Sequence, residues 1–183
     1  MPRARQQLEP PIYVFRVRIL GGYYAPEAAR AVWREIEVAA NQTLADLGTA
    51  IPLAFDFDDP HLWSFFLSGR AWDRQSEYAL HSEPDLLDGP RPHAARRIAI
   101  RDVPLPGAAG KKEFLFLFDY GDEWYFGVKL VRLGSNVEPG TRYPRIVAQA
   151  GQAPPQYPEV EDDEEDDEED DEEDDEEDEE QPE

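Results

Sequence analysis

Apolar and charged residues alternate in two segments near the start of the chain, which is the pattern of half-buried β-strands. In the first segment, residues 12–20, Arg16 and Arg18 alternate with apolar neighbours, and two glycines follow. In the second, residues 31–38, two valines, an arginine and an isoleucine occupy one side, and a tryptophan and two glutamates occupy the other. We predict that these two strands pair as a hairpin.

A helix is expected directly after this hairpin. Leu44, Leu47 and Ile51 have the i, i+3, i+7 spacing of an apolar helical stripe. Asn41 or Thr43 can accept the hydrogen bond that caps the start of the helix. The proline that follows Ile51 leaves the end of the helix undetermined, because proline disrupts a helix interior.

Three more strands are predicted further along the chain. Residues 61–68 are mostly apolar and end at a glycine, as a strand would. Residues 113–118 are apolar without alternation, which is typical of a strand covered on both faces, and residues 123–133 predict a longer strand after it. Proline and glycine punctuate residues 70–112, where we expect only a short helix or strand near residues 96–101.

The last two strands are joined by FDYGDEWYF, residues 118–126, which has two interpretations. As a hairpin turn, Gly121 supplies a positive φ and the aspartates bond to backbone amides. As a catalytic loop, Asp119 and Asp122 act as acid and base, with His61 as the candidate partner. Turn chemistry favours the first interpretation.

A metal site is a further alternative, because His61 follows two aspartates, Asp58 and Asp59. However, no two of the three histidines have the i, i+4 spacing of a helical metal site. A histidine at the start of a strand that bonds to the preceding turn explains the pattern better. We therefore predict no metal and no cofactor.

The negative charge of the chain is concentrated at its C-terminus. All 20 residues from 161 to 180 are Asp or Glu, and Glu159 and Glu183 bring the total to 22. Removing these from the 41 acids of the chain leaves 19, against 18 Lys and Arg, so the rest of the chain is nearly neutral. Such a run cannot form a core and repels itself, so we expect it to be disordered.

These patterns divide the chain into four predicted regions. Residues 1–10 are expected to be a flexible leader, and residues 11–145 a folded domain. Residues 134–158 are rich in Pro and Gly and are expected to be coil, with residues 146–158 as a linker. Residues 159–183 are the predicted disordered polyacidic tail.

Composition restricts the compartment and the chemistry. The chain has no cysteine, which excludes disulfides, thiolate zinc sites and cysteine nucleophiles. The N-terminal residues MPRARQQLEPP contain arginines but no apolar run after them, so we expect no signal peptide. No stretch approaches the roughly 20 apolar residues of a membrane helix. These features favour a cytoplasmic protein with no membrane contact.

Three sequence patterns together resemble the plasmid pRiA-type ORF-three-like family, which is associated with plasmids and transposons. The patterns are WREIEV at 33–38 with Thr43, Leu44 and Leu47; Phe57 with HLW at 61–63 and Phe65; and FDYGD at 118–122 with Trp124. They span most of the predicted domain. The resemblance implies an α+β fold with a mixed, largely antiparallel, grasp-like sheet that opens with a hairpin and then a helix.

The resemblance also implies which residues belong to the family motifs, but it implies no reaction. The motif residues, expected to be structural, are Trp33, His61, Asp119, Gly121, Asp122 and Trp124. Some members of the family are labelled as resolvases, but this chain has no evident serine or tyrosine nucleophile constellation. The family often has a histidine two places after the tryptophan of the third motif, where this chain has Phe126. A role that uses that imidazole does not apply here.

Basic residues cluster in one stretch of the chain and suggest a polyanion-binding surface. The residues are Arg91, Arg96, Arg97, Arg101, Lys111 and Lys112, and the stretch contains one acid, Asp102. The alternative is an ordinary solvated surface, which the nearly neutral charge outside the tail favours.

Three functional hypotheses follow. The first is a non-enzymatic interaction module with an unknown protein partner, whose acidic tail binds basic surfaces or divalent cations, regulates the module, or keeps it in solution. The second is a mobile-element-linked, nucleic-acid-associated protein whose basic stretch is screened by the tethered tail. The third is an enzyme that uses Asp119, Asp122 and His61.

Overall fold

The computed structural model describes residues 11–58, 60–80, 91–107, 110 and 112–158. The strands are β1 (Pro11–Gly21), β2 (Trp33–Ala39), β3 (Trp63–Phe66), β4 (Glu77–Ala79), β5 (His93–Ala94), β6 (Phe114–Phe118), β7 (Trp124–Asn136) and β8 (Arg145–Ala150), and the α-helix is α1 (Leu44–Ala54). Short 3₁₀ helices are formed by Glu27–Ala31, Arg74–Ser76, Ala95–Arg97 and Ile100–Asp102. The predicted leader, the predicted tail and Lys111 lie outside the described residues.

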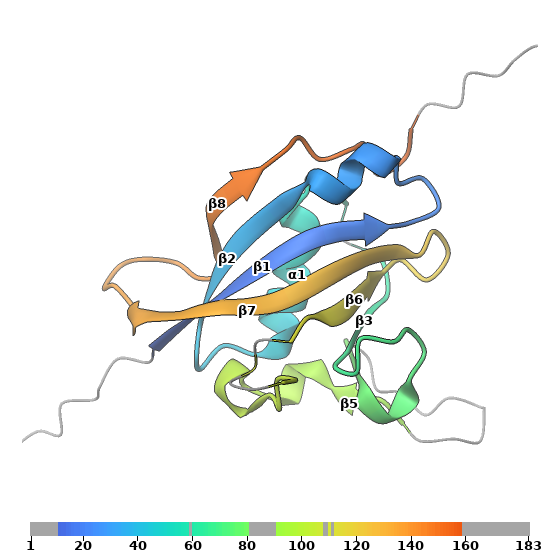
Figure 1. The fold of residues 1–183 in the computed structure, drawn as a ribbon. Helices are drawn as coiled ribbons and strands as arrows, with labels where there is room; N and C mark the ends of the chain where they lie inside the picture. Colours follow the sequence, from blue (N-terminus) through green and yellow to red (C-terminus); the bar gives the residue numbers. More distant parts are fainter. Residues whose placement is uncertain (1–10, 59, 81–90, 108–109, 111, 159–183) are drawn as a thin grey trace, which may run out of the picture.

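The strands form one mixed sheet with the order β5-β4-β3-β6-β7-β1-β2-β8 (Figure 1). Neighbouring strands are antiparallel except β4 and β5, which are parallel. One helix on a mixed sheet of eight strands is an α+β or mostly β architecture. Of the helices among the described residues, none has both the length and the apolar character that a membrane span requires.

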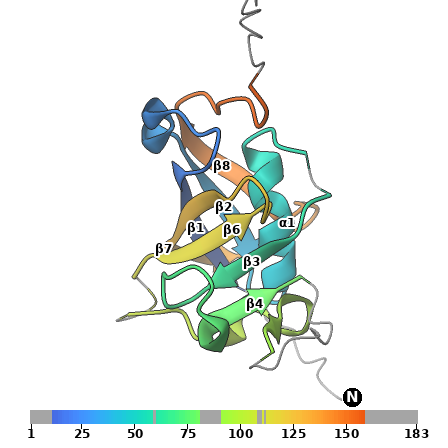
Figure 2. The ribbon, with the colours of Figure 1, turned by 90° about the vertical axis from the view of Figure 1, so that its right-hand side faces the viewer.

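The predicted opening hairpin and helix are confirmed. β1 and β2 pair antiparallel from Ile12 opposite Ala39 to Arg18 opposite Trp33. The connection between them includes the 3₁₀ helix Glu27–Ala31, so β2 begins two residues later than predicted. α1 then lies against one face of the sheet (Figure 2).

The start and end of α1 follow from local chemistry. The Asp46 N–H donates to Thr43 Oγ1 at 3.1 Å, and the Thr43 N–H donates to the Asp46 carboxylate at 2.7 Å. This reciprocal capping box selects Thr43 as the cap. The helix continues through Pro52 and ends at Ala54, one turn beyond the predicted apolar stripe.

The main core lies between α1 and the sheet. The three residues of the predicted helical stripe are fully buried. All five residues of β6 are buried, which confirms a strand covered on both faces. On the face away from the main core, Leu115 and Leu117 pack with Phe66. β6 and its neighbours are therefore the most enclosed part of the sheet.

The prediction of coil in residues 134–158 is wrong for two segments. β7 extends to Asn136, and Arg145–Ala150 form β8, which pairs with β2 and, except for Arg145, falls within the range predicted as a linker. Ile146 and Val147 stay exposed in β8, so the strand has no regular pattern of buried and exposed positions. Backbone pairing with β2 and polar side chains of β2, rather than a regular apolar face, hold the strand in place, so its signal is absent from the local sequence.

Arg34 of β2 is one of these side chains. It is buried, and its guanidinium donates to the Ala54 carbonyl at 2.9 Å, to the Ala150 carbonyl at 3.2 Å and to the Gly151 carbonyl at 3.1 Å. Burial lowers the pKa of Arg34, and its guanidinium carbon lies 4.9 Å from the centre of the Phe55 ring. Arg34 thus joins the end of α1, β2 and the end of β8.

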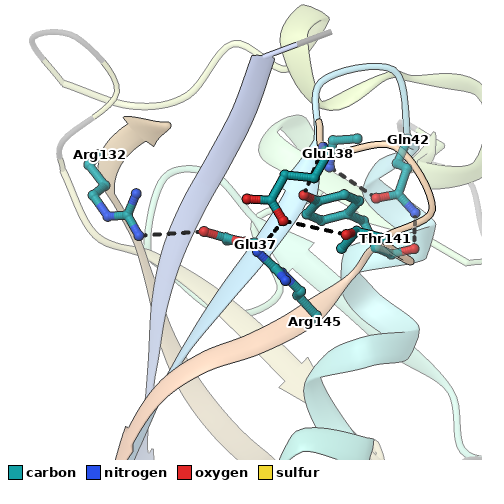
Figure 3. A network of polar contacts seen from close by, with 8 residues as sticks. Glu37, Gln42, Arg132, Glu138, Thr141 and Arg145 are labelled. Atoms are coloured by element: carbon teal, nitrogen blue, oxygen red, sulfur yellow. Dashed lines mark hydrogen bonds and ion pairs between the residues drawn. The ribbon is translucent and has the colours of Figure 1, made fainter. Parts of the chain in front are cut away.

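Glu37 of β2 is the other side chain that holds β8. Its buried carboxylate accepts from Arg145 Nε at 2.8 Å and pairs with Arg132 of β7 at 3.5 Å (Figure 3). In the same network, Gln42 Nε2 donates to the Tyr143 carbonyl at 2.6 Å. These contacts fix the loop between β7 and β8 against the rest of the sheet.

Candidate functional site

The turn between β6 and β7 is the centre of the candidate site. Asp119 has a φ of 57°, and its Oδ1 accepts a hydrogen bond from the Gly121 N–H at 3.0 Å. The Glu123 N–H donates to the Asp119 carbonyl at 2.7 Å and closes the turn. The prediction that an aspartate caps this turn is confirmed.

The prediction that Gly121 supplies the positive φ is wrong. The residues of the turn with positive φ are Asp119, at 57°, and Glu123, at 51°. A two-residue hairpin loop needs the left-handed conformation in its middle, whereas this longer turn places it at both ends. A Cβ at Gly121 would lie 3.3 Å from Asp119 Oδ1, so the glycine leaves room for the capping carboxylate.

Strand pairing brings His61 to this turn. In the antiparallel register of β3 and β6, Trp63 lies opposite Phe118, and the Asp119 N–H donates to the Leu62 carbonyl at 2.9 Å. His61 Nδ1 consequently lies 3.0 Å from Asp119 Oδ2. Because an ionised carboxylate only accepts hydrogen bonds, Nδ1 carries a proton, and in the neutral ring Nε2 is an acceptor.

The segment after β8 completes the site. The Tyr157 hydroxyl lies 2.9 Å from His61 Nε2, and Gln156 Nε2 donates to the same hydroxyl at 2.9 Å. Gln156 is buried, and its Oε1 accepts from the Asp58 N–H at 2.7 Å. Asp119, His61, Tyr157 and Gln156 therefore form one continuous set of hydrogen bonds, which we call the His61 network.

Sequence reasoning missed Gln156 and Tyr157, because it assigned both to the linker. A single aromatic residue between two prolines was the one available signal, since a buried or anchored ring is unusual in a solvated linker. Their role depends on contacts with residues almost a hundred positions away, and no periodic pattern records such contacts.

The surroundings of Tyr157 keep its phenol protonated. Burial raises the pKa of Tyr157, and the carboxylates of Asp119, Asp122 and Asp58 raise it further. A protonated phenol can donate to His61 Nε2 when this nitrogen carries no proton. At neutral pH such a phenol is also a weak nucleophile, because nucleophilic attack requires loss of its proton.

The three residues predicted for an enzyme are only partly brought together. His61 and Asp119 are in direct contact, whereas Asp122 joins Asp119 through its backbone: its N–H donates to Asp119 Oδ1 at 3.5 Å, and its carbonyl accepts from the Tyr23 N–H at 2.9 Å. Within the described residues, no group of three or more metal-ligating side chains is placed to hold an ion.

Exposed apolar side chains surround the turn. Tyr23, whose N–H bonds to Asp122, is 79% exposed, and Leu62, whose carbonyl bonds to Asp119, is 53% exposed. Tyr157 is 48% exposed. With the carboxylates among them, these side chains form a surface that is both apolar and negatively charged.

Trp33 and Trp124 of the family motifs lie within strands of the sheet, and Trp124 opens β7 directly after the turn. Trp124 is fully buried and packs edge-on against Phe57, with ring centres 4.6 Å apart. Trp33 is half-buried, and the Arg16 guanidinium carbon lies 4.4 Å from its ring centre. Arg16 also pairs with Glu35 at 2.6 Å. Both tryptophans contribute to packing rather than to the turn.

The basic stretch lies near the start of α1. Its described basic residues, Arg91, Arg96, Arg97, Arg101 and Lys112, are all exposed. The Ile98 carbonyl accepts from the Leu44 N–H at 3.0 Å, and the Ile100 N–H donates to the Gln42 carbonyl at 2.8 Å. The predicted short element near residues 96–101 is thus a pair of 3₁₀ helices bonded to the segment that leads into α1.

The fold and the site define a class of protein: a mixed-sheet domain with one α-helix among its described residues, in which a histidine–aspartate pair joins the turn between β6 and β7 to the segment that leads into β3. The chain belongs to the plasmid pRiA4b ORF-3-like protein family, whose family model matches residues 24–180. The resemblance found in the sequence motifs is confirmed.

Two individual proteins are similar to this chain. The uncharacterized protein y4hQ of Sinorhizobium fredii is 28% identical over 125 residues, which cover 68% of this chain and 58% of y4hQ. The chain thus spans less than two thirds of that relative's length. A solved structure, the protein of unknown function MM3350 from Methanosarcina mazei Go1, has a TM-score of 0.59 and 24% identity, covering 81% of this chain and 74% of that one. This second likeness shows the fold alone.

Proposed function

We propose that this protein is a non-enzymatic interaction module that binds a basic protein or peptide at the turn between β6 and β7. The observation that carries the proposal is the His61 network, which holds Tyr157 at this turn, two residues before the predicted acidic tail begins at Glu159. Tyr157, which lies beside these carboxylates, is therefore followed along the chain by the 22 acids of residues 159–183.

The contacts of His61 support binding rather than catalysis. Nδ1 faces Asp119, and Nε2 faces the protonated phenol of Tyr157. The proton within reach of Nε2 is that of the Tyr157 phenol, and the raised pKa of this phenol opposes transfer of the proton to the imidazole. The same contacts serve a binding module directly, because they hold the surface in one shape.

The surface around the turn suits a lysine or arginine side chain. Asp58 and Asp122 offer carboxylates, and the exposed rings of Tyr23 and Tyr157 offer faces to a cation. Exposed ion pairs and exposed cation–π contacts are each worth only about 0.5–1 kcal/mol. A ligand with several basic residues in succession is therefore the chemistry that this surface favours.

The acidic tail is proposed to extend the same surface. A dense run of negative charge attracts a basic partner from beyond contact distance and accelerates its capture, with an effect that salt reduces. The turn then supplies the short-range contacts that select among basic partners. Salt and removal of the tail should therefore weaken the long-range attraction, whereas substitutions at the turn should weaken the short-range contacts.

The proposal is tested by titrating a fluorescent peptide of alternating arginine and serine into the full chain and into the chain ending at Pro158, over roughly 50–300 mM salt. We expect truncation to weaken binding and to reduce its salt dependence, while saturable binding remains. In the truncated chain, the double variant Asp58→Asn, Asp122→Asn should weaken the remaining binding about fivefold, which corresponds to ~1 kcal/mol.

The matched control is Glu138→Gln, which removes an exposed carboxylate from the loop after β7 (Figure 3). This variant should bind the peptide as the unsubstituted chain does. Equal effects of the control and the double variant, or loss of all binding on truncation, would assign the binding to the tail alone and remove the turn from the proposal. DNA titrated in parallel reports whether the basic stretch contributes a separate affinity.

A further inference from the structure

A pocket of about 450 Å³ lies at the β4–β5 edge of the sheet. It is lined by Tyr78, Pro92, His93, Ala94, Arg97 and Ile98, and it shares no residue with the His61 network. Its volume falls within the range of roughly 300–1,000 Å³ that is common for small-ligand sites.

Two stacked rings form one wall of this pocket. Tyr78 of β4 and His93 of β5 are direct partners in the parallel pair, so their side chains lie on the same face of the sheet. The ring centres are 4.8 Å apart, with an angle of 27° between the planes. Tyr78 is buried whereas His93 is exposed, so Tyr78 supports an imidazole that remains accessible to a further planar group.

Positive charge borders the same pocket. Arg97 lines it, and Arg91 and Arg96 are exposed neighbours in the sequence. Within the described part of the chain, none of these three arginines forms an ion pair with a carboxylate. Glu77 is adjacent to Tyr78, but its buried carboxylate accepts from Ser64 Oγ at 2.7 Å and pairs with Arg74 at 3.4 Å.

We infer that this pocket binds a nucleotide unit, with the base stacked on His93 and the phosphate held by Arg97. The ring wall alone suits any planar group, and the arginine alone suits any anion. The two together select a ligand that has both a planar ring and a negative charge, as a nucleotide does. A free nucleotide and a nucleotide within a single strand share this chemistry. The inference does not depend on the binding of a basic partner at the β6–β7 turn.

The test uses the full chain and three probes: AMP, inorganic phosphate and a labelled single-stranded oligodeoxythymidylate, at about 50 mM salt. Binding is followed by the NMR shifts of the His93 and Arg97 side chains and, for the oligonucleotide, by anisotropy. We expect AMP or the oligonucleotide to bind saturably and to shift both side chains, and phosphate to bind at least tenfold more weakly. Binding by AMP indicates a free-nucleotide site, and binding by the oligonucleotide alone indicates a strand site; either supports the inference.

Variants separate the ring contact from the charge contact. Arg97→Ala should weaken binding about tenfold, as loss of a charge-assisted contact to phosphate does. His93→Ala should weaken it about fivefold or more, whereas His93→Phe, which keeps a stacking ring, should stay within about twofold of the unsubstituted chain. Both residues are exposed, so the fold should be retained.

The control is Arg30→Ala, which removes an exposed arginine in the 3₁₀ helix between β1 and β2. We expect a change of less than about twofold, because one distant charge contributes little at this salt. Equal losses in Arg97→Ala and Arg30→Ala would mean diffuse electrostatic attraction and would overturn the inference. So would equal losses in both His93 variants, phosphate binding as tightly as AMP, or no binding of either nucleotide probe.

Discussion

At the β6–β7 turn, the polar atoms of the His61 network have partners within the chain, whereas at the β4–β5 pocket Arg97 has no carboxylate partner among the described residues. Asp119 bonds to the turn amides and to His61, and His61 bonds to Tyr157. The pocket instead combines an exposed imidazole on a buried phenol with an exposed guanidinium.

This contrast separates two uses of polar residues. A group whose hydrogen bonds are completed by the chain holds segments together, and its loss lowers the free energy of unfolding. A group left uncompensated at a concave surface contributes little to folding and is available to a ligand. Substitutions in the two regions should therefore differ in their effect on the free energy of unfolding.

The largest difference in the free energy of unfolding is expected between the variants Arg34→Ala and Arg97→Ala. Loss of the Arg34 guanidinium leaves the carbonyls of Ala54, Ala150 and Gly151 without their donor in a buried region. We expect the free energy of unfolding to fall by about 3–4 kcal/mol in Arg34→Ala, and by no more than ~0.5 kcal/mol in Arg97→Ala, by urea denaturation. Similar losses in the two variants would contradict the distinction between a residue that stabilises the fold and one that is available to a ligand.

Substitution of Asp119 should have an intermediate effect that depends on the new side chain. Asp119→Ala removes the cap on the Gly121 amide and the contact with His61, and places alanine at a φ of 57°. Together these changes should cost about 2 kcal/mol. Asp119→Asn keeps an acceptor and tolerates this φ, so we expect about 1 kcal/mol or less in the same assay. An asparagine variant as unstable as the alanine variant would mean that the negative charge, rather than turn geometry, is what His61 requires.

A smaller effect is expected for Tyr157→Phe. The variant keeps the ring but removes the hydroxyl that bonds to His61 and Gln156. Because the site is half exposed and water replaces part of the lost bonding, the free energy of unfolding should fall by about 0.5–1 kcal/mol. The ¹⁵N shift of His61 Nε2 should change at the same time. An unchanged nitrogen shift would show that the segment after β8 is not fastened to the turn in solution.

The smallest effect concerns the pKa values of two tyrosines, one from each region. Burial raises the pKa of Tyr78, whereas burial and three neighbouring carboxylates raise the pKa of Tyr157. Both phenols hold their proton more tightly in the folded state than in the unfolded state, where the pKa is about 10. Their contribution to stability is therefore complete below about pH 10 and is lost as pH rises through the folded values.

Salt distinguishes these two phenols. We expect about 0.5 M salt to lower the pKa of Tyr157, because salt screens the carboxylates, and to leave that of Tyr78 unchanged, because burial is insensitive to salt. The measurement is an NMR titration of ¹³C-labelled tyrosine rings, with each signal assigned by its Tyr→Phe variant. If the pKa of Tyr157 did not change with salt, the neighbouring carboxylates would not contribute to it.

Several elements could be predicted from interactions between residues that are close in the sequence. The stripe of α1 and the apolar run of β6 each depend on neighbours within a few positions, and each was predicted; the cap of α1 was narrowed to Asn41 or Thr43, of which the structure selects Thr43. Asp119 was identified as a turn cap for the same reason, although the residue with positive φ was misassigned to Gly121.

Some residues of the candidate site could be named from the sequence, but their contacts could not be predicted from it. His61 and Asp119 were both named from the sequence, because the family motifs contain them, but only the register of β3 against β6 brings them together. In the pocket, Arg97 was named as a basic residue, whereas its partners Tyr78 and His93 meet only through the parallel pairing of β4 and β5.

By itself, the sequence determined the family, the opening hairpin and helix, the covered central strand and the concentration of acid in one run. Only the tertiary structure decided that Arg145–Ala150 form a strand and that Tyr157 belongs to the site. The physical reason is that both features depend on partners that are distant in the sequence: β8 on backbone pairing with β2 and on contacts with Arg34 and Glu37, and Tyr157 on its hydrogen bond to His61. Such contacts leave no periodic pattern in the segments that they hold.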